Sequence, residues 1–145
     1  MRHLTCLTLL AALVSSCGGS DPLDLTQSYT VTLVEGGAPP QLVIATEGCD
    51  VTVLGGHLTF EAADQFEVSL EVFTDCTRGG GIAAAATYRY LGTADIVGPR
   101  ITFHVVTGGS PPDFEGVGVG TGPIEVTVPG LVPLVDEISV TFGAE

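Results

Sequence analysis

The sequence predicts an all-β domain, an antiparallel up-and-down meander that closes into a barrel of eight or nine short strands. From residue 29 onward, apolar and polar residues alternate in short runs, which is the pattern of half-buried strands. Clusters of Gly, Pro and Asp interrupt these runs about every 8–12 residues, a spacing typical of barrels and sandwiches. Short turns join neighbouring runs throughout, which favours a closed meander over the alternative, a β-sandwich.

Composition indicates one acidic domain of short strands. The chain has 145 residues, 45% of them hydrophobic, with 20 Gly and 9 Pro. It carries 17 acidic residues against 4 basic ones, for a net charge of −13. This balance excludes nucleic acid as a partner and electrostatic attraction to anionic lipid, because both require the opposite sign. We expect the acidity to keep the protein soluble and monomeric; an acidic face for a cation or a basic ligand is the alternative.

The first 16 residues are typical of a signal peptide. Arg2 and His3 precede the apolar stretch Leu4–Val14, which is too short to span a membrane. We therefore predict a signal peptide over residues 1–16, a flexible tether over 17–27 and one β-barrel domain over 28–145. Export follows from this division, and a secreted soluble product is one possible outcome.

The stretch LVSSC, residues 13–17, resembles the lipobox of bacterial lipoproteins. The resemblance implies cleavage before Cys17 and acyl chains on that residue, which would anchor the protein to a membrane. In a cell with two membranes, Gly18 after this cysteine implies sorting to the outer one. Cys17 is thus the predicted site of lipid attachment.

Two short strands are predicted before the first long hairpin. Residues 28–34 alternate cleanly, and we expect Tyr29, Val31 and Leu33 on one face. Gly and Pro break the pattern, and a second apolar run follows over residues 41–45.

A long hairpin is predicted next, with its two strands over residues 49–61 and 66–76. The matching apolar faces permit Phe60 to lie opposite Phe66. In the first strand, the alternation of apolar residues at the start is out of phase with the alternation at the end. All of them can face one core only if one extra residue intervenes, and a bulge at Gly55-Gly56 would supply it.

Counting back through that bulge sets Val53 against Val72, Val51 against Thr74, and Cys49 against Cys76. A slip of two residues would make the cysteine pair diagonal. In an exported protein, two facing cysteines predict a disulfide. Closing a loop of this size with a disulfide stabilises the folded protein by roughly 3 kcal/mol. Reactive thiols or a metal site are the alternatives, but no histidine lies at useful spacing from these cysteines.

Further strands complete the meander. Residues 83–91 alternate as a strand despite four alanines. We expect turns over residues 92–100 and a rigid connection over 129–133. The remaining strands are expected over 101–106, 114–119 and 124–128, with Ile138, Val140 and Phe142 lining the last one.

Three stretches resemble the small lipocalin-like, calycin-type lipoproteins of bacteria: SYTVTLVEGGAPP, LTFEAADQFEVSLEVFTDC and the run TYRY…ITFHVV. The resemblance implies a barrel with a cavity for a small apolar ligand. The side chains that would line such a cavity are Phe60, Phe66, Tyr88, Tyr90 and Phe103.

No motif in the sequence indicates catalysis, a metal or a cofactor, and we expect none of the three. His57 and His104 are predicted to point outward from their strands into solvent. The glycines of residues 116–122 do not match a nucleotide-binding loop and suit a curved strand better. Two functions remain: a lipid-anchored barrel that binds a small apolar ligand or a protein partner, or a structural envelope protein with a filled barrel and no ligand.

Overall fold

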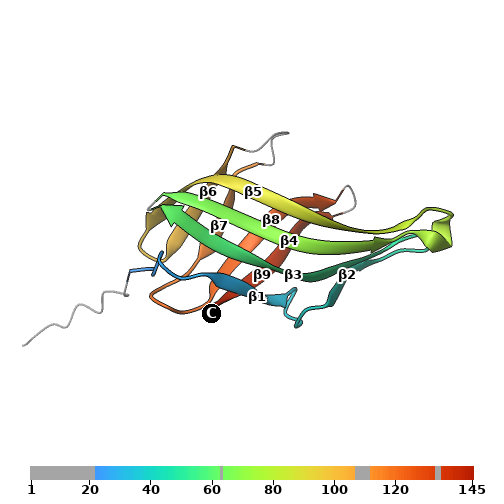
Figure 1. The fold of residues 1–145 in the computed structure, drawn as a ribbon, viewed down its shortest axis with the longest axis horizontal. Coiled ribbons are helices and arrows are strands. Elements are labelled where there is room, and N and C mark those ends of the chain that lie inside the picture. The colour runs from blue at the N-terminus through green and yellow to red at the C-terminus, as the bar shows by residue number, and fades with distance from the viewer. Residues whose placement is uncertain (1–21, 63, 107–111, 133–134) are drawn as a thin grey trace, which may run out of the picture.

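The computed structural model describes residues 22–62, 64–106, 112–132 and 135–145, and these form an all-β fold (Figure 1). One short 3₁₀ turn, η1 (Thr77–Gly79), accompanies the strands. The strands are β1 (Tyr29–Val34), β2 (Gln41–Ala45), β3 (Asp50–Ala62), β4 (Gln65–Asp75), β5 (Ala83–Val97), β6 (Arg100–Val105), β7 (Phe114–Val117), β8 (Ile124–Val132) and β9 (Val135–Ala144).

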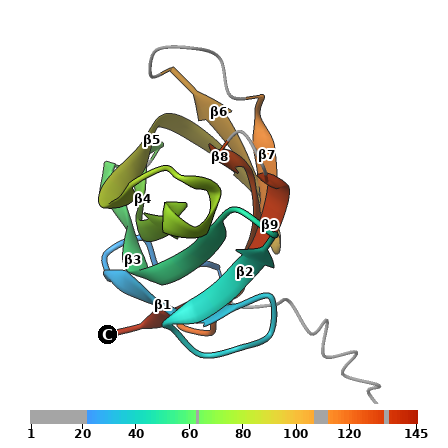
Figure 2. The same cartoon turned by 90° about the vertical axis from the view of Figure 1, so that its right-hand side faces the viewer.

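Eight of these strands close into an antiparallel barrel. The sheet runs in the order β1-β9-β8-β7-β6-β5-β4-β3-β2, and β1 also pairs with β3, which closes the ring. Strand β2 is the extra one and pairs with the first part of β3. A view along the long axis shows the strands arranged as a ring (Figure 2). The predicted meander barrel is therefore confirmed, and the sandwich alternative is wrong.

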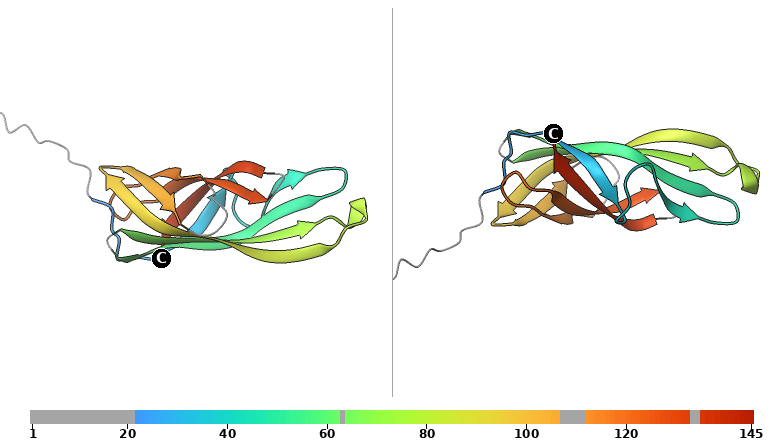
Figure 3. Two further views of the ribbon diagram at one scale, coloured as in Figure 1. Left: turned by 90° about the horizontal axis from the view of Figure 1, so that it is seen from above. Right: turned by 90° about the horizontal axis from the view of Figure 1, so that it is seen from below.

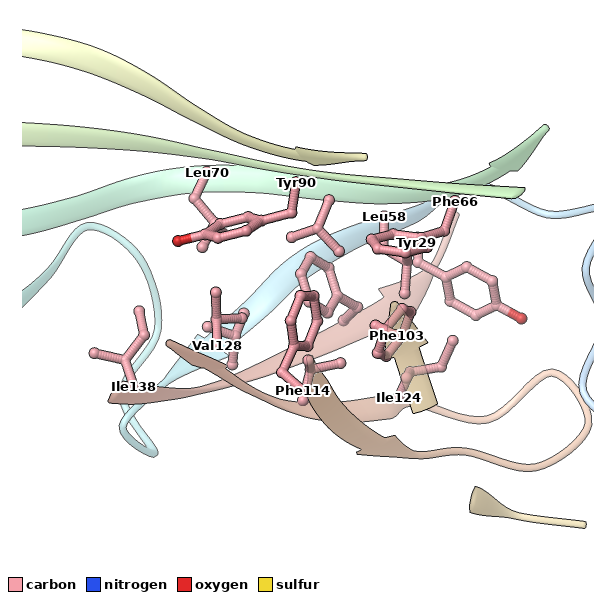
Figure 4. Packing of buried hydrophobic residues seen from close by; sticks show 14 of the residues in the cluster. Tyr29, Leu58, Phe66, Leu70, Tyr90, Phe103, Phe114, Ile124, Val128 and Ile138 are labelled. Carbon is pink, nitrogen blue, oxygen red and sulfur yellow. The ribbon is translucent and has the colours of Figure 1, made fainter. Parts of the chain in front are cut away.

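The barrel interior holds the hydrophobic core (Figure 4). Every strand of the barrel contributes inward side chains at alternate positions. Each large apolar side chain buried in this way contributes about 1.5–3 kcal/mol to folding. The largest fully buried side chains are Tyr29, Phe103, Phe142, Leu58, Leu70, Ile101 and Ile124.

The long hairpin has the predicted register. Phe60 lies opposite Phe66, Val53 opposite Val72 and Val51 opposite Thr74. The register shifts between Val53 and Gly55, so the extra residue is Leu54, next to the predicted glycine pair. Cys49 and Cys76 form the disulfide, with 4.0 Å between their Cα atoms.

In β1, the prediction that Leu33 shares one face with Tyr29 and Val31 is wrong. Leu33 is 39% exposed, whereas its neighbour Val34 is fully buried. The register with β9 shifts between Val31 and Leu33, so an irregularity at Thr32 reverses the alternation.

Two stretches predicted as turn or connection belong to strands. Strand β5 continues through Gly92 to Val97, paired with β6. A Cβ on Gly92 would lie 1.9 Å from the carbonyl oxygen of His104, so this glycine permits close pairing and does not end the strand. Likewise β8 runs on to Val132, and Pro129 still pairs with Glu137.

The segment before β1 packs onto the barrel. Leu23 is buried in the core, and the amide of Asp24 donates a hydrogen bond to the carbonyl of Gly120 at 2.9 Å. The hydroxyl of Tyr29 donates to the carbonyl of Asp24 at 2.7 Å. Leu23 and Asp24, which lie within the tether predicted over residues 17–27, thus contact the barrel. The predicted signal peptide and Cys17 lie outside the described residues.

Part of the sheet extends beyond the barrel. We call this part the arm; it consists of β2, the β3 residues 50–54, the β4 residues 71–75, the β5 residues 83–87 and the tip, residues 76–82. Figures 1 and 3 show it as a ribbon at one end of the long axis. At the tip, the amide of Gly79 donates to the carbonyl of Gly48 at 3.1 Å and Arg78 forms an ion pair with Asp50. The disulfide joins the same two segments.

Candidate functional site

The aromatic residues predicted to line a cavity lie in or against the core. Phe66, Tyr90 and Phe103 are buried, while Phe60 and Tyr88 are partly buried and pack against the same cluster. Phe114, which the sequence reasoning did not single out, joins them (Figure 4).

These rings contact one another. The centroids of Phe66 and Phe103 are 4.8 Å apart in an edge-to-face arrangement, and Phe103 stacks on Phe114 at 4.8 Å. Tyr90 meets Phe114 edge-on at 5.7 Å. Because aromatic pairs pack favourably at these separations, the rings fill the space between them.

Both buried tyrosine hydroxyls have a backbone partner. The Tyr90 hydroxyl donates to the carbonyl of Pro129 at 2.8 Å, and that of Tyr29 donates to the carbonyl of Asp24. Burial raises the pKa of Tyr90 to about 12 and also raises the pKa of Tyr29. Both hydroxyls therefore stay protonated at neutral pH and hold the chain together.

The glycines of the sequence GVGVGTG make room for the core. A Cβ on Gly116 would lie 3.1 Å from Cε2 of Phe103 and 3.0 Å from the carbonyl oxygen of Glu125. A Cβ on Gly118 would lie 2.9 Å from Ile124. These positions serve close packing, as the interpretation of a curved strand requires.

Two hollows lie on the surface of the described chain. One, of about 330 Å³, lies where β1 meets β3 and is mainly polar. It is lined by Ser28, Thr30, Gly56, His57, Thr59, Glu71 and Glu145. The other, of about 240 Å³, is lined by Glu61, Gln65, Phe66, Leu91, Gly92, Thr93 and Val106.

His104 points outward as predicted, but it lies between two carboxylates. Its Nδ1 is 2.7 Å from Oδ2 of Asp113, and its Nε2 is 3.2 Å from Oδ2 of Asp95. Hydrogen bonds to Asp113 and then Asp95 raise the pKa of the imidazole. Because both ring nitrogens lie close to carboxylate oxygens, the cationic form of the imidazole is favoured, and the arrangement is an ion-pair link.

Asp95 lies in a stretch that the sequence predicts as turns, residues 92–100, so this link was not predicted. Residues of β5 continue to alternate between the two faces past Gly92, and this alternation was the signal that could have placed Asp95 in a strand. The two carboxylates bind opposite sides of the ring, so they cannot chelate one ion together with it. Among the described residues, no group of three or more His, Cys, Asp or Glu is arranged to hold a metal ion. Nor does that part of the chain contain a helix long and apolar enough to cross a membrane.

The arm exposes apolar side chains on its outer face. Leu42 lies beside Thr52 of β3, which lies beside Phe73 of β4, and these side chains share one face. Leu42 is 49% exposed, Leu54 42% and Phe73 37%. This surface was not predicted from the sequence. The usable signal was that Phe73 alternates in phase with the outward acidic residues of β4.

Outward acidic residues continue along the same face of β4. Glu67 pairs with Arg89 of β5, with 3.6 Å between Oε1 and Nε. Ser69, between the two glutamates, is 2% exposed. Glu71 is exposed, and its carboxylate has no hydrogen bond or ion pair within the described part of the chain.

No protein-family model, curated protein or solved structure matches this chain. The resemblance to lipocalin-like lipoproteins stays a prediction, and the function must be argued from the site itself.

Proposed function

We propose that the chain is an exported, lipid-anchored envelope protein that binds a protein partner through its arm. The barrel serves as a filled, rigid base. The observation that carries this proposal is a contrast in burial. The aromatic side chains of the barrel pack on one another, whereas Leu42, Leu54 and Phe73 of the arm lie on a solvent-facing surface. Neighbouring apolar side chains that share one exposed face form a candidate interaction surface.

The position of the N-terminal segment supports this role. The first described residues lie at the end of the barrel away from the arm tip (Figures 1 and 3). Five residue steps separate Cys17 from Pro22, which span at most about 18 Å. Acyl chains on Cys17 would therefore hold the barrel near the membrane and direct the arm away from it.

The anchor is tested by blocking its formation. We expect Cys17→Ser to release the protein from the membrane fraction, because a membrane attachment by acyl chains needs this residue. Globomycin, which blocks lipoprotein signal cleavage, should make a larger precursor accumulate. Unchanged size and fractionation in both experiments would remove the anchor from the proposal.

A small apolar ligand inside the barrel is disfavoured by the ring packing, because a ligand of drug size needs several hundred Å³. The second candidate is a structural envelope protein with a filled barrel and no partner, and the same packing favours it. We propose no enzymatic role for either candidate.

The arm distinguishes these two candidates. A photo-crosslinking residue at position 73, on the arm, should capture a protein in the native envelope. The same residue at position 127, exposed on the outer face of β8, is the control and should capture none. Equal labelling at both positions, or none at position 73, would favour the purely structural role.

A further inference from the structure

The first half of β5 has a free edge. Ala83–Arg89 pairs with β4 on one side, and pairing with β6 begins only at Gly92. No backbone hydrogen bond reaches the other side of Ala83–Arg89 from any residue that the structure describes. In an antiparallel strand, alternate residues direct their N–H and C=O groups to each side. The edge therefore presents a row of unpaired donors and acceptors.

Residues 83–87 of this edge lack the features that usually block further pairing, which are charges, proline and bulges. Residues 83–87 read AAAAT, all are exposed, and their register with β4 is unbroken. The other edge of the arm differs. Strand β2 follows Pro39-Pro40 and has a register shift between Leu42 and Ile44.

The neighbouring row on β4 gives the edge a chemical pattern. On the outer face, Glu71 lies beside Thr87, Phe73 beside Ala85 and Asp75 beside Ala83. A strand added to β5 would lie two strand spacings, about 9.6 Å, from β4. Because the intervening side chains on β5 are small, long side chains on the added strand can reach across to Glu71, Phe73 and Asp75.

We infer that this edge binds an extended segment of a partner protein by strand addition, and that the segment carries basic, apolar and basic residues at three alternate positions. The basic residues meet Glu71 and Asp75, and the apolar residue meets Phe73. This inference rests on the proposed function of the arm. Strand addition takes affinity from main-chain hydrogen bonds and specificity from alternate side chains.

The net charge of the chain favours a basic segment of another protein at this edge over a second copy of the chain. Each chain has a net charge of −13, and an antiparallel copy would bring its own Glu71 and Asp75 to the same face. Glu71 lacks a basic partner within the described residues, so a basic segment supplies one.

The experiment uses the full chain with its disulfide formed and a labelled peptide, acetyl-TKVIVKT-amide. We expect saturable binding by fluorescence anisotropy and none by the charge-reversed peptide acetyl-TEVIVET-amide. Ala85→Lys should weaken binding at least about tenfold, because it places a cation on the edge. Thr127→Lys adds the same charge on the outer face of β8 and should leave binding unchanged.

A second pair of variants tests the carboxylate. Glu71→Gln should weaken binding about threefold, as expected for a solvent-exposed ion pair. Glu125→Gln, which removes the same charge from β8, should have no effect. Hydrogen exchange should show new protection of the amides in residues 83–87 when the peptide binds.

Failure of the peptide to bind, or equal binding by all four variants, would overturn the inference. A dimer of the free chain that Ala85→Lys dissociates would also overturn it, in favour of a second copy. If crosslinking at position 73 succeeds while the peptide fails, only this inference is lost. If both fail, the proposed binding function of the arm is lost as well.

Discussion

The barrel interior and the outer face of the arm are built on the same strands but differ in how far their apolar side chains are buried. In the barrel half of β4, Phe66, Val68 and Leu70 are at most 2% exposed, because opposite strands of the closed ring cover them. In the arm half of the same strand, Phe73 lies on the uncovered outer face at 37% exposure. The alternation continues through both regions, so Val72 on the inner face of the arm is also buried, at 1% exposure, and Phe73 lies on the opposite, uncovered face.

Burial on the inner face contributes to the stability of both regions. Burial of apolar side chains stabilises the barrel. The arm also buries Val51, Val53 and Val72 on its inner face, and at its tip the Cys49–Cys76 disulfide and the hydrogen bond from Gly79 to Gly48 join the hairpin in addition. The outer surface of the arm is therefore free of a packing role, and substitutions there should cost much less than substitutions in the barrel.

The largest expected effect comes from a matched pair of phenylalanines. Phe103→Ala should lower the free energy of unfolding by about 3–5 kcal/mol, because the ring is fully buried against Phe66 and Phe114. Phe73→Ala should cost about 1 kcal/mol or less. Urea unfolding of both variants measures the difference. Equal losses would mean that the arm face is packed as part of the core.

Removing the disulfide should have the next largest effect. The Cys49→Ala/Cys76→Ala double variant should lose about 3 kcal/mol of unfolding free energy, because a cross-link between residues 27 apart restricts the unfolded chain. A reducing agent should destabilise the parent protein by a similar amount and leave the variant unchanged. Unfolding that is insensitive to both changes would show that the cross-link does not hold the arm.

Glycine substitutions compare packing in the two regions at a smaller scale. Gly116→Ala should cost about 1–3 kcal/mol, because its Cβ would press on Phe103 and the strand backbone. Gly55→Ala, beside the bulge at the base of the arm, should be nearly neutral, since no heavy atom lies within 4 Å of the added Cβ. Thermal unfolding distinguishes these results, and a reversed order would contradict the packing described for the barrel.

The smallest expected effect is a pH dependence from His104. Its pKa is raised in the folded state, so the link stabilises the protein fully below the ordinary pKa of 6.5 and is lost as pH rises through the raised value. Asp113→Asn should lower the pKa of His104, while Glu125→Gln should not. An NMR titration of the imidazole measures this directly. An imidazole titrating at or below its ordinary value would exclude the link.

The sequence predicted the barrel, the long hairpin and the disulfide because paired strands of regular alternation leave few registers open. It did not predict the reversal at Thr32, where a single irregularity places Leu33 outside and Val34 inside. It also ended β5 at Gly92, because glycine was taken for a turn when the close approach of β6 requires it.

The candidate site was harder to predict than the fold. The arm face depends on which strand faces lack a covering layer, and only the three-dimensional arrangement determines this. The link at His104 depends on two carboxylates that are each nine residues away in the sequence. Neither spacing is a motif, whereas the cysteine pair followed from register alone.

Native mass spectrometry of the protein purified from its own membranes reports the anchor, the disulfide and any retained molecule in one measurement. We predict a chain that begins at Cys17, carries acyl chains on that residue, contains one disulfide and retains no small molecule. A small apolar molecule bound in equal amount and released by organic solvent would contradict the filled barrel. An unacylated Cys17 would contradict the anchor.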